Sequence, residues 1–226
     1  YAVVGTFLVS LALMLRVRPS DRKQMPEQGS ILEDIWAGLA YALRTPPIPA
    51  LLLIVIAEMP GGVIITHIPV YARDVLEVGP IGFGVLSASL GAGFLAGSMV
   101  ATAVGGFPRK GLVLLVTAAM WDVSMATFAF SRVYPLSAAL LFIMGVGGAI
   151  HVNLLITMLQ TRASDEMRGR VMSIYSLALA SLPLGFILGG ALAALVSNEF
   201  ALVVSGLLST PLIIVVYLRS AHLRQA

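Results

Sequence analysis

Two acidic residues lie within apolar stretches of this sequence. Glu58 directly follows the apolar run 50–57, and Asp122 closely follows the apolar run 112–120. A carboxylate in such surroundings loses hydration, which favours its protonated form or a partner that brings a cation or a hydrogen-bond donor. Proton exchange or binding of a cationic group is therefore the chemistry to expect at Glu58 and Asp122. A structural hydrogen bond to a neighbouring helix is the alternative for each.

His151 and Asn153 are two further polar residues inside an apolar segment. Imidazole titrates near neutral pH, so His151 is a candidate for proton coupling or substrate binding, with Asn153 as its polar neighbour. A lone histidine is more often a hydrogen-bonded packing residue, and the same two interpretations hold for His67. These titratable residues are scattered along the chain and cysteine is absent, so we expect no metal site, no cofactor and no enzymatic activity.

The composition places these residues in a membrane. Hydrophobic residues make up 58% of the chain and charged residues 11%, far from the proportions of a soluble domain of this size. A water-soluble bundle needs polar stripes at helical spacing, whereas the runs 50–57 and 112–120 are apolar on every helical face. The pI near 9.5 does not indicate nucleic-acid binding, because the basic residues lie in short loops rather than on a continuous face.

Seven apolar segments can be read from the sequence, and we expect an all-α polytopic transmembrane helix bundle. The segments are 1–15, 48–72, 81–105, 111–131, 134–159, 171–197 and 200–218. The first would be about 22 Å long against a hydrocarbon core of about 30 Å, so we expect it to be the truncated end of a helix. The expected organisation is this helix end at 1–15, a cytoplasmic linker with an amphipathic helix at 16–47, a six-helix domain at 48–219 and a cytoplasmic tail at 220–226.

The linker contains a predicted amphipathic helix. Ser30 and Glu33 have the spacing of a capping box, which marks a helix start. Apolar residues then recur at helical spacing on one face, as expected of a helix that lies along a membrane surface; they are Leu32, Ile35, Trp36, Leu39 and Leu43.

The basic residues predict the orientation of the bundle. Of the 14 Lys and Arg residues, all but Arg73 and Arg132 fall on one side of the predicted spans. By the positive-inside rule, that side, which includes the C-terminus, is cytoplasmic.

Small residues form a repeating pattern. Segments three and six carry a small residue at every fourth position, with Gly93, Gly97, Gly185 and Gly189 at their centres, and such ridges predict close helix packing. Segments two and five instead carry interruptions that we interpret as hinges, at Pro60, Gly61 and Gly62 and at Gly145, Gly147 and Gly148. Segments two, three and four are thus interrupted, ridged and smooth, and segments five, six and seven repeat this order. Such a repeat is typical of the inverted three-plus-three arrangement of secondary transporters.

Several motifs resemble the major facilitator superfamily, in the branch of the enterobactin exporter and the macrolide-efflux proteins. They are Glu33-Asp-Ile-Trp-Ala-Gly-Leu-Ala-Tyr-Ala-Leu-Arg, Gln160-Thr-Arg-Ala-Ser-Asp-Glu-Met-Arg-Gly-Arg-Val-Met-Ser-Ile-Tyr-Ser and Leu182-Pro-Leu-Gly. The resemblance covers essentially the whole chain. It implies that the seven segments are helices six to twelve, the C-terminal half of a transporter whose N-terminal half is partly missing. The ridges would then pack against that N-terminal half, and Asp122 would lie at the periphery.

The resemblance also implies a function. We expect export of a small amphipathic molecule, drug or siderophore by alternating access, coupled to protons, in the bacterial cytoplasmic membrane. The partners would be the lipid bilayer, the N-terminal half and the small-molecule substrate, with no nucleic acid. A non-transporting membrane scaffold or sensor is the alternative.

Two cytoplasmic loops match the family to different degrees. By resemblance, Arg168 and Arg170, together with Asp165, would form a cytoplasmic gate that pairs with acids of the N-terminal half; interfacial anchoring is the alternative interpretation. The loop at Arg109 and Lys110 lacks the acidic residue that the family carries before its basic pair. We therefore expect Arg109 and Lys110 to act as topological anchors.

Overall fold

The structure, a computed structural model, describes residues 2–16, 31–103 and 109–224. These residues form α-helices, short 3-10 and π turns and connecting loops, with no β-strand among them, so the expected all-α class is confirmed. The chain divides into two units, Tyr1–Asp34 and Ile35–Ala226. The first contains the apolar helix α1 (Ala2–Arg16). Most of the predicted linker, including Ser30 of the expected capping box, lies outside the described residues.

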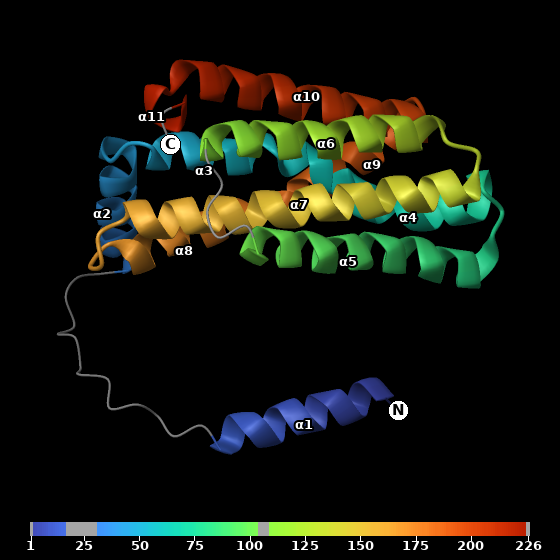
Figure 1. Ribbon diagram of the computed structural model, residues 1–226, viewed down its shortest axis with the longest axis horizontal. Helices are drawn as coiled ribbons and strands as arrows, with labels where there is room; N and C mark the ends of the chain where they lie inside the picture. The colour runs from blue at the N-terminus through green and yellow to red at the C-terminus, as the bar shows by residue number, and fades with distance from the viewer. Residues whose placement is uncertain (1, 17–30, 104–108, 225–226) are drawn as a thin grey trace. The chain divides into compact units, whose positions relative to one another are not determined.

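The second unit begins within a helix that lies across the others. α2 (Ile31–Arg44) is followed by the proline turn at Thr45 to Pro47, and the axes of its part Ile35–Arg44 and of α3 (Ile48–Ala57) differ by 106°. Proline cannot continue a helix from the preceding turn, which explains the sharp change of direction. Figure 1 shows α2 perpendicular to the long helices, at one end of this unit.

The second predicted segment is a broken helix. α3 is followed directly by the 3-10 turn η1 (Met59–Gly62), by α4 (Val63–Val70) and by the π turn η2 (Tyr71–Val75). Pro60 has no backbone N–H, and Gly61 and Gly62 are weak helix formers, so the α-helical ladder fails at this point. The interruption predicted at these three residues is present in the structure.

The remaining helices are long and apolar. They are α5 (Gly79–Ala103), α6 (Lys110–Phe130), α7 (Tyr134–Arg162), α8 (Arg168–Leu179), α9 (Leu182–Leu195), α10 (Asn198–Arg219) and the short α11 (Ala221–Arg224). Among the described residues, α5, α6, α7, α8 with α9, and α10 give five stretches that can cross a membrane, or six if the bent pair α2 and α3 is taken as one. Many large apolar side chains face outward, for example Ile81, Leu95 and Leu195, as a bilayer-facing surface requires. The chain is an integral membrane protein.

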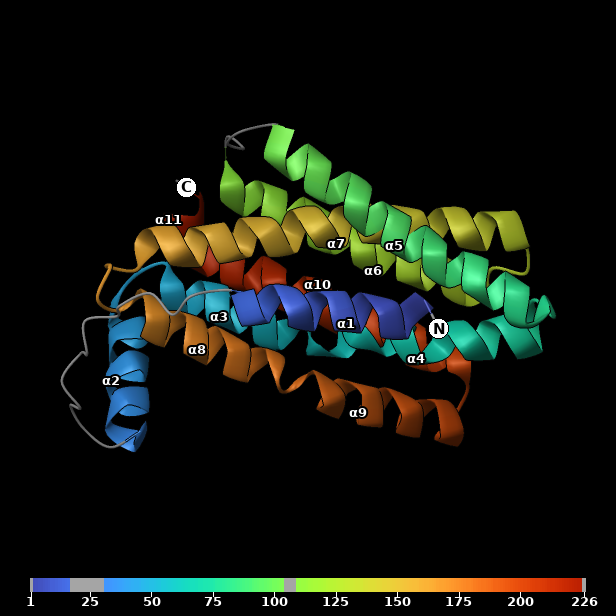
Figure 2. The ribbon, with the colours of Figure 1, turned by 90° about the horizontal axis from the view of Figure 1, so that it is seen from below.

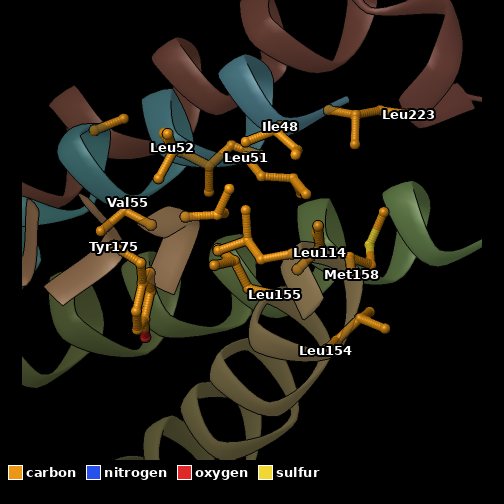
Figure 3. Close-up of a cluster of buried hydrophobic side chains, with 14 of the residues drawn as sticks. Ile48, Leu51, Leu52, Val55, Leu114, Leu154, Leu155, Met158, Tyr175 and Leu223 are labelled. Atoms are coloured by element: carbon orange, nitrogen blue, oxygen red, sulfur yellow. The ribbon is translucent and has the colours of Figure 1, made fainter. Parts of the chain in front are cut away.

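Two hydrophobic clusters hold the helices together. Figure 3 shows one of them, in which Ile48, Leu51 and Leu52 of α3 face side chains of α6 and α7 such as Leu114 and Leu155. The second cluster joins α4 and η2 to α5, α6 and α7. α3 and α4 run in the opposite direction to α7, as Figures 1 and 2 show.

The small-residue ridges pack closely, but against helices of this same chain. A Cβ atom at Gly93 or Gly97 would collide with the backbone carbonyl of Phe142 or Val146, both on α7. On α9, a Cβ at Gly185 would collide with the carbonyl of Met59, and one at Gly189 with the side chain of Val63. The expectation that these ridges pack against a separate N-terminal half is therefore wrong at these four glycines.

The predicted interruption of segment five is also wrong. α7 continues through Gly145, Gly147 and Gly148 as one helix. These glycines allow close approach instead: a Cβ at Gly145 would meet the backbone of α5, and one at Gly147 would lie 3.3 Å from the carbonyl oxygen of Thr117. The second break lies in segment six, between α8 and α9, where Pro183 occupies the first turn of α9.

Candidate functional site

The helix break brings Glu58 to His151. Glu58 directly follows α3 as its C-terminal cap, immediately before η1, and His151 lies in the middle of α7. Glu58 Oε1 and His151 Nε2 are 2.6 Å apart, with the histidine side chain 4% exposed and the glutamate side chain 31% exposed. The distance is that of an ion pair, although the ring N–H direction is not aligned on the oxygen as in a hydrogen bond. Glu58 and His151, which are separate candidates in the sequence, thus form one pair.

The other ring nitrogen of His151 is held by α6. Nδ1 lies 3.0 Å from Thr117 Oγ1 and 3.1 Å from the carbonyl oxygen of Leu114. A carbonyl oxygen only accepts, and the Thr117 hydroxyl already donates to the carbonyl of Val113 at 2.8 Å. The geometry therefore assigns a hydrogen to Nδ1, which donates to these two oxygens.

This assignment bears on the protonation of the Glu58–His151 contact. If Nδ1 carries a hydrogen, a neutral imidazole presents a lone pair at Nε2, which repels a carboxylate 2.6 Å away. The contact is favourable when either Nε2 or the Glu58 carboxyl carries a second proton. A proton shared between Glu58 and His151 would therefore stabilise the described contact.

The pair opens onto a cavity of about 200 Å³ between the helices. Its walls are mostly apolar or aromatic, with a few polar groups. The lining residues are Val55, Glu58, Gly61, Gly62, Ile65, Phe94, Thr117, Ala118, Trp121, Asp122, Gly148, His151, Val152, Leu179, Leu182, Ser209 and Ile213. They come from the broken second segment and from α5 through α10, so the cavity depends on the whole bundle.

Asp122 is the second carboxylate of this cavity. Its residue is 7% exposed, and the Thr210 hydroxyl of α10 donates a hydrogen bond to Oδ2. Asp122 interacts electrostatically with both Glu58 and His151. The cavity thus combines two carboxylates and one imidazole, and its net charge depends on how many protons the three groups hold.

Trp121 and Phe94 provide the aromatic part of the wall. Their rings are edge to face with centroids 6.3 Å apart, and Trp121 Nε1 donates to the carbonyl oxygen of Gly61 at 3.3 Å. An apolar, aromatic wall beside carboxylates suits an amphipathic molecule, because rings give large contact areas and their faces attract cations. Among the described residues, no group of three or more His, Asp or Glu side chains is arranged to hold a metal ion.

Comparisons with known proteins agree with this architecture. Residues 1–183 match the Major Facilitator Superfamily. The chain belongs to the major facilitator superfamily. Members of this superfamily are transporters, not enzymes.

A curated relative within the superfamily is the multidrug efflux pump Tap of Mycolicibacterium fortuitum. It is 27% identical to this chain over 202 residues, which cover 85% of the chain and 48% of the pump. The chain thus spans about half the length of this curated relative.

Two candidates from the sequence lie apart from the cavity of this superfamily member. Asn153 is exposed, and its amide donates to the carbonyl of Ala149 at 2.8 Å and toward Ser98 Oγ on α5 at 3.5 Å. His67 is buried in α4, where Nδ1 lies 2.9 Å from the carbonyl oxygen of Val63. Neither residue lines the cavity.

The residues of the predicted cytoplasmic gate contact their own loop, the end of α7 and α2. Arg168 lies 2.6 Å from Asp165 and also donates to the carbonyl of Gln160 at 3.0 Å, near the C-terminal end of α7. The Arg170 side chain packs beside Gly38 of α2, and its guanidinium lies 3.6 Å from Met167 Sδ. In the described conformation Arg168 thus stabilises the end of α7, where a cation is favoured by the helix dipole.

Three residues of the site were missed in the sequence: Thr117, Trp121 and Thr210. Thr117 and Trp121 are four residues apart in an otherwise apolar helix, a spacing that places them on one face. Together with Asp122, which follows Trp121, they mark the polar face of α6. Thr210 gave no such signal, because its importance depends on the position of α10 beside α6.

Proposed function

We propose that this chain is the C-terminal half of a secondary active exporter, in which protonation of the Glu58–His151 pair drives alternating access. The single observation that carries the proposal is the contact of 2.6 Å between these two residues in a cavity at a helix break. A proton-coupled carrier needs a site that gains and loses a proton within its transport path. The Glu58–His151 pair combines two groups that can bind a proton with a location at the cavity.

The substrate that we propose is a small amphipathic organic molecule. The wall combines apolar side chains, two aromatic rings and two carboxylates. A cavity of about 200 Å³ is small beside the roughly 300–1,000 Å³ of drug-sized sites, so we infer that a second six-helix half completes it. The relative in Mycolicibacterium fortuitum, a multidrug efflux pump, supports export as the direction of transport.

The helix break is the proposed moving part. The turn η1 lacks regular α-helical hydrogen bonding at Pro60, next to the residue that exchanges the proton. A local change of the Glu58 carboxyl can therefore bend α4 relative to α3 with few hydrogen bonds to break. Discontinuous helices commonly form the substrate and ion sites of secondary transporters.

We propose that the end of the bundle with α2 and the C-terminus is cytoplasmic. The basic residues Arg44, Lys110, Arg162 and Arg219 all lie at the helix ends on this side, whereas Arg73 and Arg132 lie at the other. The positive-inside rule then sets the orientation. The membrane that we propose is the bacterial cytoplasmic membrane, in keeping with the bacterial relative.

The test is efflux from cells that express this chain together with its N-terminal half. We expect accumulation of a fluorescent amphipathic dye to fall in expressing cells and to recover when a protonophore removes the proton gradient. Efflux that persists without a gradient would contradict secondary active transport. Unchanged accumulation for every dye and drug tested, with the protein present in the membrane, would instead favour a scaffold or sensor.

A further inference from the structure

We propose that Trp121 is a positioning residue that ties the helix break to α7 and keeps the Glu58–His151 pair closed. This inference deepens the proposed function, because the pair is the proposed proton site. Its structural basis is independent of transport. It rests on three contacts of one indole ring.

The first contact is with the break itself. Trp121 Nε1 donates to the carbonyl oxygen of Gly61, and a Cβ built on Gly61 would lie 3.2 Å from the same nitrogen. The indole edge therefore lies directly against the backbone of η1. Since Gly61 belongs to a 3-10 turn, its carbonyl gains a partner from α6 where the regular α-helical pattern is interrupted.

The second contact is with α7. A Cβ built on Gly148 would lie 2.7 Å from Trp121 Cζ3, so the far edge of the ring occupies the space where a side chain would otherwise be. Phe94 of α5 packs edge to face on the indole and closes its remaining side. The ring is thus a wedge between two glycines, one on the broken helix and one on α7.

The indole ring of Trp121 and the Glu58–His151 pair contact the same two helices at matching positions. Gly61 follows Glu58 by three residues, and Gly148 precedes His151 by three residues. Because α3 and α4 run opposite to α7, the wedge contacts both helices one turn from the ion pair, toward the end that contains η2 and Tyr134 (Figure 1). Opening of the Glu58–His151 contact by bending at η1 would pull Gly61 away from the indole.

This coupling makes Trp121 a reporter of the pair. The chain contains two tryptophans, so Trp36→Phe leaves Trp121 as its only one. The other titratable groups that face the pair are Asp122 of α6 and Tyr175 of α8. Asp122 is adjacent to Trp121 in the sequence and must be tested separately.

The experiment is acrylamide quenching of Trp121 fluorescence in lipid nanodiscs, across the titration range of histidine. It uses the Trp36→Phe chain combined with its N-terminal half, in which any tryptophan is also replaced by phenylalanine. We expect a pH-dependent step in quenching that disappears in Glu58→Gln and persists in Asp122→Asn. Gly148→Ala should displace the indole, with stronger quenching at every pH and no step. Gly91→Ala is the matched control, because a Cβ there meets nothing within 4 Å.

Two results would overturn the proposal. A flat quenching profile in the Trp36→Phe chain would show that the pair does not move the indole. A step that persists in Glu58→Gln, or that is lost only in Asp122→Asn, would assign the signal to another group. Loss of transport in the complete protein with an intact quenching step would count against the proposed function alone.

Discussion

The His151 ring donates from Nδ1 to two oxygens of α6 and contacts the Glu58 carboxylate through Nε2. The ring therefore links α6 to the end of α3. The Thr117 hydroxyl, 3.0 Å from Nδ1, is the side-chain part of this link. The ring orientation that allows the 2.6 Å contact with Glu58 is therefore set by a helix other than its own. The dependence of the pair on α6 leads to the first prediction.

Thr117→Val should weaken coupled export. The substitution keeps the shape of the side chain but removes the acceptor oxygen, and a buried hydrogen bond contributes about 1 kcal/mol, or about fivefold in an equilibrium. We expect gradient-driven efflux to fall by about this factor, measured as initial dye efflux rate. Thr117→Ser retains the hydroxyl and serves as the control. Equal rates for the valine and serine variants would show that the Leu114 carbonyl alone positions the ring.

Thr210→Val should destabilise the contact between α6 and α10. It removes the donor to the buried Asp122 carboxyl, and a buried polar group left with fewer partners costs about 1–3 kcal/mol. The measurement is the midpoint of thermal unfolding in detergent, with Thr210→Ser as the control.

If Asp122 is structural, the Asp122→Asn variant should still export its substrate against a concentration gradient. Failure of Asp122→Asn to export, with normal stability, would place Asp122 in the coupling step.

Gly93→Ala and Gly91→Ala should have opposite consequences for stability. Both lie in α5, but a Cβ at position 93 collides with the rigid carbonyl of Phe142, whereas one at position 91 meets nothing within 4 Å. We expect Gly93→Ala to lower the free energy of unfolding by about 1–3 kcal/mol through overpacking. Gly91→Ala should be neutral or stabilising by up to about 1 kcal/mol, because alanine favours the helix. Equal loss in the two variants would contradict the packing of α5 on α7.

Cysteine labelling tests the proposed orientation. The sequence contains no cysteine, so single cysteines can be introduced without background. A cysteine in place of Asn198, at the start of α10, should react with an impermeant thiol reagent added to intact cells. A cysteine in place of Glu166, between α7 and α8, should react only after the membrane is permeabilised. The reverse pattern would invert the proposed topology.

The sequence was sufficient to predict the five long apolar spans and one of the two helix breaks. Span limits follow from the lengths of apolar runs, and Pro60 with two glycines breaks a helix through local backbone chemistry alone. The break before α9 was not predicted, although Pro183 in Leu182-Pro-Leu-Gly is typical of a helix start. The glycines of α7 were misread as a hinge, since glycine spacing alone does not distinguish flexibility from close packing.

The candidate site could be predicted only as separate residues. Glu58, Asp122 and His151 stand out because titratable groups are rare in apolar segments. That Glu58 and His151 touch, while Asn153 faces away from the cavity, depends on how α7 is rotated against the broken helix. The role of Trp121 could not be predicted, because its partners are two glycines distant in the sequence. Such relations arise from tertiary packing, which periodicity does not encode.

Transport by Glu58→Gln tests the central claim most directly. The protein that combines this chain with its N-terminal half is reconstituted in vesicles, and uphill transport under an imposed pH gradient is compared with substrate exchange in the absence of a gradient. The amide keeps the shape of the side chain but exchanges no proton, so we predict loss of uphill transport with exchange retained. Uphill transport by Glu58→Gln at the wild-type rate and with the wild-type pH dependence would contradict the assignment of Glu58 and His151 as the proton site.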